Sequence, residues 1–517
     1  MAETRENPAN QTLLLAMVGK PFYQQDFEKL WYARDMPSRH PRFHQKVKTT
    51  DRKQNSNDKG GDAAATETSA IAGKKSAGVF VPTQLPLQSH VKETEFPQIY
   101  NLDLQRKLQS FLQVPLQVQN LLWQVELSPG GSLGQSGAIP KERAAELLMN
   151  ANTNDRNGTQ PQESLLIFRG HEALGDGISL VAALTDLCDE AEELKKELAQ
   201  EMDRNKRNRR KLSWWQRFFK FVQSLYNYSI GSLHAFWHFW ILSLKSSRNS
   251  FQQLEALLTA EDTTTRGEKL ISWIPVASLE EIEHVAKSMS KSTNQPVTVQ
   301  DVILSCVAAA VARQLQNHQM ENERDQTSKR NIKVPDRINV RIHDTYNDDA
   351  VLARGETVSH AMGTMYAAIP CDVTSLASQR LAKVHASLRE VPKGPALFWS
   401  RKSAQIVSAI LPAAWANRIF QKVQPNAAIS MTTMTNGPAG GRRKLHMGGR
   451  EVEVFQCFLP LPAGVPIGLC ATTYGGEVSL SITAEPWAVP NADTFLSWVL
   501  DEYKFLYTES PVVLEGS

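Results

Sequence analysis

Three side chains that can exchange protons stand close together in residues 171–177, which read His-Glu-Ala-Leu-Gly-Asp-Gly. An imidazole such as His171, or a carboxylate such as Glu172 or Asp176, can accept a proton from a hydroxyl group, and burial tunes the pKa at which it does so. The same pattern is also typical of a solvated connection between a strand and a helix. The neighbouring elements decide how such a segment is positioned.

The sequence around this segment predicts a buried strand and a helix that meet at a tight corner. Residues 165–168 form a continuous apolar run, and glycines punctuate the turn that follows. Residues 178–188 have a helical apolar pattern, and residues 121–127 alternate as a half-buried strand does. We expect the strands at 121–127 and 165–168 to be neighbours in one sheet, joined by a polar connection over 128–163.

The second half of the chain also mixes strands with helices. Apolar runs and alternating patterns predict strands at 270–276, 337–342, 364–369, 452–458, 467–474 and 478–483. Helical patterns predict helices at 278–288, 298–316, 374–389 and 491–507, with one or two more within 397–423. Strands and helices mixed in both halves predict an α/β protein with mixed sheets.

Length and composition limit the function classes. A chain of 517 residues exceeds what one hydrophobic core usually supports, so we expect an N-terminal domain at 1–203 and a C-terminal domain at 266–517. Lys and Arg exceed Asp and Glu by only three, which gives no sign of nucleic-acid binding. The five cysteines are scattered, which argues against a disulfide framework and against a zinc site.

Two segments differ from the rest in composition. Residues 49–78 contain no aromatic residue and few aliphatic ones, so we expect a disordered insertion there. Residues 204–265 form a linker in which a basic run is followed by many Trp and Phe residues, with no Asp, Glu, Lys or Arg between Phe221 and Leu244. The N-terminus lacks a signal-peptide pattern, so we expect the protein to face the cytosol.

The linker has three possible roles. Residues 221–244 are long enough to span a bilayer, but polar residues interrupt them. They could also pack as a helix on the protein surface. The aromatic residues with the basic flank favour a helix that lies in the membrane interface, so we expect residues 204–245 to contact a membrane surface.

Several motifs resemble the wax ester synthase/diacylglycerol acyltransferase family, in the same order along the chain. Residues 171–177 resemble the His-His-x-x-x-Asp-Gly signature of the coenzyme-A-dependent acyltransferase fold. The strand around Trp123, the helix start at 297–304 and the strand at 338–341 are similar to further family motifs. The segment from Met434 through Asn436 to Gly476 is similar to the family's C-terminal domain. The resemblance covers most of residues 20 to 507.

The resemblance implies a fold and a reaction. The fold has two acyltransferase-like domains, similar to chloramphenicol acetyltransferase, around a central channel. An O-acyltransferase of this kind moves a fatty acyl group from acyl-CoA to diacylglycerol or a long-chain alcohol and forms triacylglycerol or wax ester. Acyl-CoA is a co-substrate, and neither a cofactor nor a metal is implied, because a thioester is already activated. The second His of the signature is the general base, and Asp176-Gly177 holds the loop.

The chain departs from the signature where the base should stand. If Asp176 and Gly177 set the register, His171 matches the first His and Glu172 replaces the second. Successive strand residues point to opposite faces, so the two side chains are not interchangeable. Three outcomes are open: His171 acts as the base in a slipped corner, Glu172 acts as the base, or the chain binds acyl-CoA or lipid at a membrane surface without transferring the acyl group.

The resemblance also suggests supporting residues and a location. We expect Gly175, Arg341, Asn436 and Trp123 to line the channel or support it, with a salt bridge between Asp176 and Arg341. Asn436 could equally be a turn residue beside Gly437 and Pro438. Histidines outside the motifs, such as His343, are expected to be structural or at the surface. We expect the protein at the endoplasmic reticulum or lipid-droplet surface, or at the plasma membrane.

Overall fold

The computed structural model describes most of the chain, in segments. These are residues 8–49, 78–94 without 84, 101–116, 121–154, 161–200 without 198, 268–324, 335–345, 362–391 without 373 and 374, 393–411, 427–434 and 441–510 without 463, together with ten single positions between 215 and 419. The predicted insertion, nearly all of the predicted membrane-contact segment 204–245, and Asn436 lie outside these residues.

The first sheet carries the signature segment. Its strand order is β11 (His446–Met447), β12 (Arg450–Phe458), β1 (Asn10–Gly19), β6 (Gln162–His171), β5 (Trp123–Ser132) and β4 (Val91–Glu93). β4 and β5 run parallel, and the other neighbours are antiparallel. The expected pairing of β5 with β6 is confirmed.

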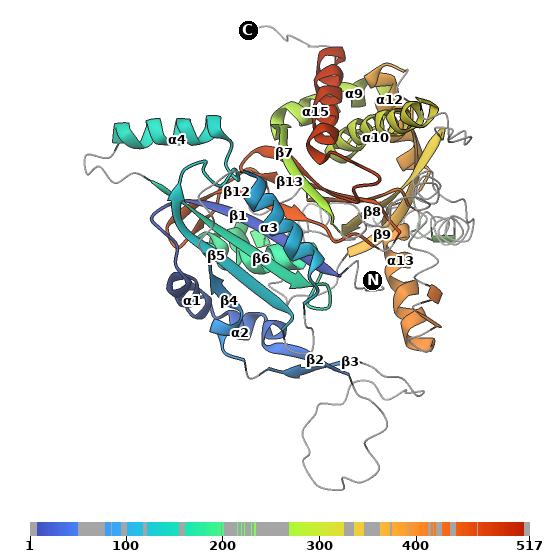
Figure 1. Cartoon of the computed structure of the whole chain (residues 1–517). Helices are drawn as coiled ribbons and strands as arrows, with labels where there is room; N and C mark the ends of the chain where they lie inside the picture. The colour runs from blue at the N-terminus through green and yellow to red at the C-terminus, as the bar shows by residue number, and fades with distance from the viewer. Residues whose placement is uncertain are drawn as a thin grey trace.

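Both faces of the first sheet are covered, which explains the continuous apolar runs in β1 and β6. Leu13 and Phe168 belong to one buried cluster, whereas Leu14 and Ile167 belong to the cluster on the opposite face. The helix α5 (Gly177–Thr185) packs on the first face and α3 (Asn101–Gln113) on the second. The corner at residue 171 therefore lies at the end of a strand that is held from both sides (Figure 1).

The second sheet has the strand order β7 (Leu270–Ser278), β14 (Glu477–Ala484), β13 (Ile467–Tyr474), β10 (Ile429–Met434), β8 (Arg337–Thr345) and β9 (Met362–Pro370). β10 runs parallel to both of its neighbours. The largest core lies between this sheet and its helices, which Figure 1 shows gathered at one side of the sheet: α9 (Leu279–Thr293), α10 (Val299–Arg324), α12 (Ala377–Arg389) and α15 (Ala492–Glu509).

One segment of the C-terminal half crosses over and joins the first sheet. β11 and β12 follow β10 in the chain, yet they join the first sheet, where β12 pairs antiparallel with β1. β13 then returns to the second sheet. The architecture is the predicted α/β fold with mixed sheets, and the predicted domain boundaries at 203 and 266 did not anticipate this exchange.

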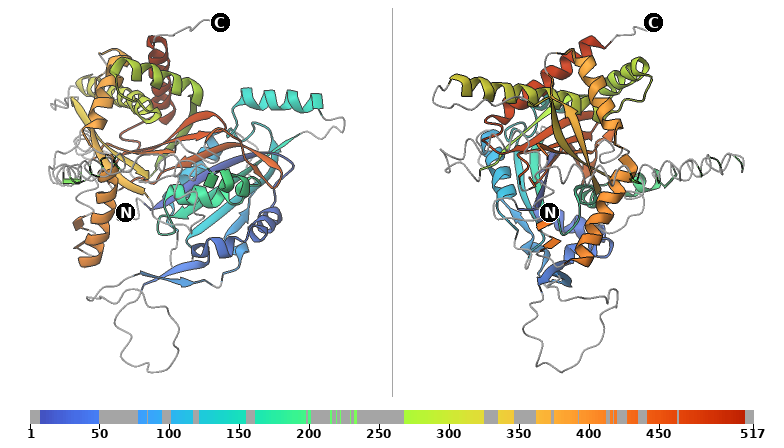
Figure 2. Two further views of the ribbon diagram at one scale, coloured as in Figure 1. Left: turned by 180° about the vertical axis from the view of Figure 1, so that it is seen from behind. Right: turned by 90° about the vertical axis from the view of Figure 1, so that its right-hand side faces the viewer.

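One predicted connection is wrong. Residues 128–163 contain the helix α4 (Lys141–Asn154), which the sequence analysis described as polar linkage. Its apolar residues do recur at helical spacing, as Ala144, Leu147 and Leu148 do, but they are few among polar neighbours, and Met149 is largely exposed. Figure 1 and the left view of Figure 2 show α4 projecting from the body of the molecule.

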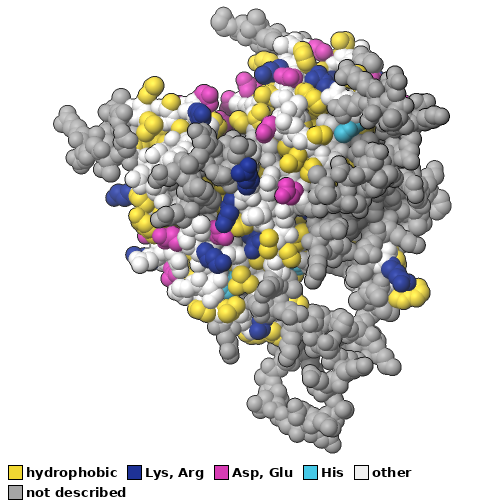
Figure 3. All heavy atoms as spheres, viewed as in Figure 1, with side chains coloured by type: hydrophobic (Ala, Val, Ile, Leu, Met, Phe, Trp, Pro, Cys, Tyr) yellow, Lys and Arg dark blue, Asp and Glu magenta, His cyan; other side chains and the backbone are white. Residues whose placement is uncertain are grey.

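The remaining elements are short or peripheral. In the first half they are α1 (Gln24–Ala33), α2 (Met36–Arg39), η1 (Pro41–His44), β2 (Gln45–Thr49), β3 (Gly78–Pro82) and η2 (Leu87–Ser89), and in the second half α13 (Lys393–Ile410). On the face drawn in Figure 3, basic, acidic and apolar side chains are interspersed, in keeping with the balanced composition. Among the described residues, none of the helices combines the length and the apolar character that crossing a bilayer requires.

Candidate active site

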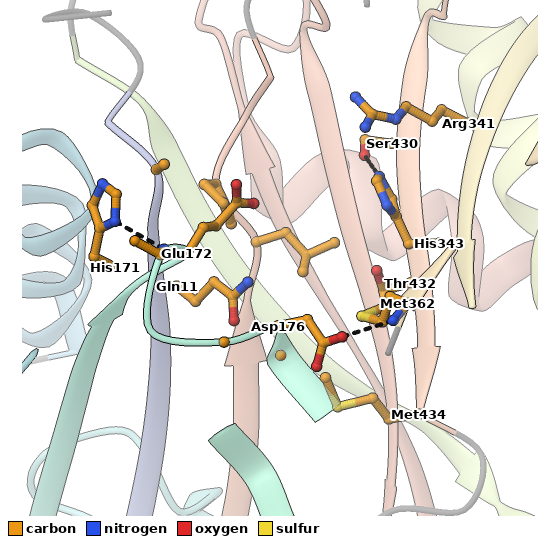
Figure 4. Close-up of a pocket in the computed structure, with 16 residues that line it drawn as sticks. Gln11, His171, Glu172, Asp176, Arg341, His343, Met362, Ser430, Thr432 and Met434 are labelled. Atoms are coloured by element: carbon orange, nitrogen blue, oxygen red, sulfur yellow. Dashed lines mark hydrogen bonds between the residues drawn. The ribbon is translucent and has the colours of Figure 1, made fainter. Parts of the chain in front are cut away.

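A cavity of about 420 Å³ lies where the corner after β6 faces the second sheet (Figure 4). The first sheet contributes the corner and the start of β1, and the second sheet contributes one face of β8 and β10. The residues that line the cavity are Ala9, Gln11, His171, Glu172, Ala173, Gly175, Asp176, Gly177, Arg341, His343, Met362, Ser430, Thr432, Met434, Leu459 and Pro460. Its volume is in the range of small-molecule sites.

His171 and Glu172 point to different sides of the corner. His171 is the last residue of β6 and pairs with Asn10, whereas the Glu172 amide donates a hydrogen bond to the carbonyl oxygen of Ala9 at 2.8 Å. The alternation of the strand therefore continues through the corner. In Figure 4 the Glu172 carboxylate extends into the space in front of β8 and β10, and the His171 ring lies on the other side, away from Arg341 and His343.

The His171 ring is held by the backbone of its own corner. Its Nδ1 accepts a hydrogen bond from the Ala173 amide at 3.0 Å, and the residue is 8% exposed. In a neutral imidazole one nitrogen accepts and the other carries the proton. Since Nδ1 accepts, the Nε2 atom of neutral His171 is a donor, and this tautomer has no free nitrogen with which to take a proton.

Asp176 connects the two sheets. Its Oδ1 accepts hydrogen bonds from the amide of Ser179 at 3.0 Å and from the Ser179 hydroxyl at 2.6 Å, which makes Asp176 the N-cap of α5. Its Oδ2 accepts a hydrogen bond at 2.7 Å from the amide of Met362, the first residue of β9. A Cβ atom at Gly177 would come 3.2 Å from the Met434 methyl group, so glycine at this position leaves space for the Met434 side chain.

The opposite wall is a polar face of the second sheet. In the register of β8 and β10, Arg341 pairs with Ser430, and His343 pairs with Thr432. Residues two apart on a strand share a face, so these four side chains point the same way. The intervening residues, such as Ile342, belong to the core on the other face.

His343 is a neutral, partly buried member of this wall. Its Nε2 lies 2.9 Å from the Ser430 hydroxyl oxygen, and its Nδ1 lies 3.4 Å from the Thr364 hydroxyl oxygen. Burial, and then the charge of Arg341, hold the pKa of His343 well below its usual range. The expectation that His343 lies outside the site is wrong, because the strand alternation that carries Arg341 to the cavity carries His343 there too.

The expected salt bridge between Asp176 and Arg341 is wrong. Figure 4 shows the two side chains well apart, with His343 and Thr432 between them. The Asp176 carboxylate accepts backbone and hydroxyl hydrogen bonds instead. These three hydrogen bonds of the signature aspartate come from neutral donors, and the guanidinium of Arg341 lies at the other end of the cavity.

The other predicted site residues divide into three groups. Gly175 lines the cavity together with the corner residues. Trp123 is away from the cavity and is 1% exposed. It stacks on Trp31 and His90, and its indole N–H donates to the carbonyl oxygen of Phe43 at 2.8 Å, so it supports the fold. Asn436 lies outside the described residues.

Several residues that line the cavity were not predicted from the sequence, and three of them, Gln11, Ser430 and Thr432, lie on strands whose alternation could have revealed them. Gln11 shares a face with Ala9 at the start of β1, and Ser430 and Thr432 alternate with buried apolar residues in β10. No motif marked these positions, since which face of a strand meets the cavity depends on how the two sheets are placed.

Comparison with known proteins extends these observations. Residues 360–506 match the family model of the WS/DGAT C-terminal domain. None of the curated protein sequences matches the chain. Among solved structures, the wax ester synthase/diacylglycerol acyltransferase from Marinobacter aquaeolei VT8 is similar, with a TM-score of 0.52 and 13% identity, over 98% of this chain and 96% of that one.

Other solved structures share the fold at lower identity. The trichothecene 15-O-acetyltransferase from Fusarium sporotrichioides matches with a TM-score of 0.52 and 10% identity, over 97% of this chain and 91% of that one. The starter condensation domain of rhizomide synthetase matches with a TM-score of 0.51 and 9% identity, over 98% of this chain and 90% of that one. Residues 360–506 thus match a WS/DGAT C-terminal domain, and the solved structures show that nearly the whole chain shares their two-sheet fold.

Proposed function

We propose that the protein transfers a fatty acyl group from acyl-CoA to the hydroxyl group of an acceptor such as diacylglycerol or a long-chain alcohol, with Glu172 as the general base. The observation that carries the proposal is the orientation of the Glu172 carboxylate, which reaches into the cavity from the position of the second signature histidine. His171 is the weaker candidate, because its Nδ1 is occupied by the Ala173 amide.

The reaction needs one proton transfer and close positioning. Glu172 takes the proton from the acceptor hydroxyl, and the oxygen attacks the carbonyl carbon of the thioester. When the intermediate collapses, the carbon–sulfur bond breaks and Glu172 returns the proton to the departing thiolate of coenzyme A. The products are an ester and free coenzyme A. Holding the two reactants together in a cavity supplies a large part of the rate acceleration.

Incubating the purified protein with palmitoyl-CoA and either hexadecanol or a diacylglycerol tests this function. We expect free coenzyme A to appear in equal amount to wax ester or triacylglycerol, measured by thiol titration and lipid chromatography. Saturable binding of palmitoyl-CoA without product from either acceptor would support the alternative, a family member that binds acyl-CoA or lipid and has lost transfer.

We further propose that residues 204–245 attach the protein to the cytosolic surface of a lipid-storing membrane, such as the endoplasmic reticulum or a lipid droplet. The basic and aromatic composition of this segment supports the proposal. A variant lacking residues 204–245 is expected to lose sedimentation with anionic lipid vesicles and to keep its transfer rate toward detergent-solubilised hexadecanol. If the deleted variant still sediments with the vesicles, the attachment lies elsewhere.

A further inference from the structure

Arg341 is a buried cation in the cavity wall, and no anionic partner for it is found in the part of the chain that the structure describes. The residue is 9% exposed, and its Nε and Nη1 atoms have no hydrogen-bond partner. Among the described residues, no ion pair includes Arg341. A charge that is removed from water and left unpaired destabilises the folded protein strongly, so natural proteins retain such a group where a ligand completes it.

Among the described residues, the neighbours of Arg341 add no further charge to this wall. The pKa of His343 is lowered far enough that the ring is neutral at physiological pH. Tyr366, the cross-strand partner of Arg341 in β9, is buried, and burial raises the pKa of its hydroxyl, so it is neutral as well. Ser430, the partner of Arg341 in β10, adds an uncharged hydroxyl group. The nearest carboxylates of the cavity, Glu172 and Asp176, belong to the opposite wall (Figure 4).

We propose that Arg341 and Ser430 bind the carboxylate of the acyl acceptor, so that the protein uses a hydroxy acid in preference to a neutral alcohol of equal length. The proposal rests on the proposed function and names its acceptor class. The single positive charge of the Arg341 guanidinium is balanced by a ligand with one negative charge. A planar carboxylate also accepts hydrogen bonds from the N–H groups of a guanidinium in good geometry. A phosphate monoester would bring a charge of about −1.5 to −2 at neutral pH.

Charge also fixes the direction in which such an acceptor enters. The Glu172 carboxylate repels an acidic group and attracts a hydroxyl proton, whereas Arg341 attracts the acidic group. An acceptor with both groups therefore lies with its hydroxyl at Glu172 and its carboxylate at Arg341, which is the orientation that the proton transfer requires. Apolar side chains also line the cavity, among them Met434 and Leu459.

Binding tests the proposal without relying on turnover. Decanoate, decanol and decyl phosphate are titrated into the full-length protein by calorimetry, with wild type, Arg341→Met, Arg341→Lys and the control Arg337→Met. Arg337 lies on the same strand but its side chain is 55% exposed, at 3.9 Å from Glu390. We expect decanoate to bind wild type and Arg337→Met alike, and Arg341→Met about tenfold or more weakly.

Each result has one meaning. The proposal is supported if Arg341→Met loses decanoate binding while its melting temperature without ligand is no lower than that of wild type. Decanoate binding by Arg341→Lys that is intermediate between Arg341→Met and wild type supports it further. Equal decanoate binding by Arg341→Met and wild type, or tighter binding of decanol or decyl phosphate than of decanoate, overturns it. If Arg341→Met does not fold, Arg341→Lys gives the same comparison, since it keeps the charge and loses the planar donor geometry.

Turnover separates this proposal from the proposed function. With palmitoyl-CoA as donor, we expect ω-hydroxydecanoate to exceed decanol in kcat/KM by about tenfold or more for wild type and for the control Arg337→Met, and we expect Arg341→Met to abolish that difference. The Glu172→Gln variant should bind decanoate normally. Arg341-dependent decanoate binding with no transfer to any acceptor would refute the proposed function and leave the anion site standing.

Discussion

Glu172→Gln is expected to lower the rate of acyl transfer by a factor of about 100 to 10,000, the usual contribution of a positioned general base. Glutamine has nearly the same shape as glutamate but cannot take a proton from the acceptor hydroxyl. The measurement is the release of free coenzyme A from palmitoyl-CoA under saturating acceptor. Because Glu172 is a corner residue at the cavity edge, the melting temperature of the variant should stay close to that of wild type.

His171→Gln is the matched control for this variant. The His171 ring accepts one backbone hydrogen bond and lies on the other side of the corner, so its replacement should slow transfer much less than Glu172→Gln does. A loss of transfer in His171→Gln that equals or exceeds the loss in Glu172→Gln would mean that the corner rearranges when substrate binds and that the histidine is the base. Full activity in both variants would place the base among other residues of the cavity.

Trp123→Ala is expected to destabilise the protein by about 3–5 kcal/mol, the usual cost of deleting a buried aromatic side chain. Trp123 is stacked between Trp31, at 4.9 Å between ring centroids, and His90, at 4.4 Å. Its loss would open a cavity in the first sheet's core and leave the Phe43 carbonyl oxygen without the indole N–H that now donates to it at 2.8 Å. Chemical denaturation followed by circular dichroism measures the change in unfolding free energy.

Two further variants show whether packing is the cause. Trp123→Phe keeps most of the aromatic contact and loses the indole hydrogen bond, so its effect should be clearly smaller. Tyr32→Ala, at a side chain that is 58% exposed, should change the unfolding free energy by no more than about 0.5 kcal/mol. A near-native stability of Trp123→Ala would show that the first sheet does not depend on this cluster, and Trp123 would then need another role.

Local sequence patterns were sufficient for much of the fold. The alternation in β5, the apolar run in β6 and the helical pattern of α10 each predicted an element that the structure contains. The signature segment also predicted where the cavity begins, because a Gly-punctuated corner after a buried strand leaves side chains free to face an opening. These features depend on neighbouring residues in the chain, which the sequence displays directly.

The features that local patterns missed depend on long-range placement. The relative placement of the two sheets decides whether Asp176 faces Arg341. In the folded protein the Asp176 carboxylate accepts a hydrogen bond from the Met362 amide instead. His343 and Ser430 come from strands far apart in the chain that pair only in the folded sheet. The exchange of β12 into the first sheet has no local signal at all, since its alternation is compatible with either sheet.

The exchanged strand has a consequence for how the protein is made. β12 covers the edge of β1, and it is encoded more than four hundred residues after β1 begins. Until residue 458 has been synthesised, β1 therefore presents open backbone donors and acceptors along the edge that β12 later covers, and unpaired strand edges of this kind promote wrong association between chains. The first strands of this sheet are synthesised early and its last strands late. The N-terminal half of the nascent chain therefore depends on the C-terminal half to cover the exposed edge of β1.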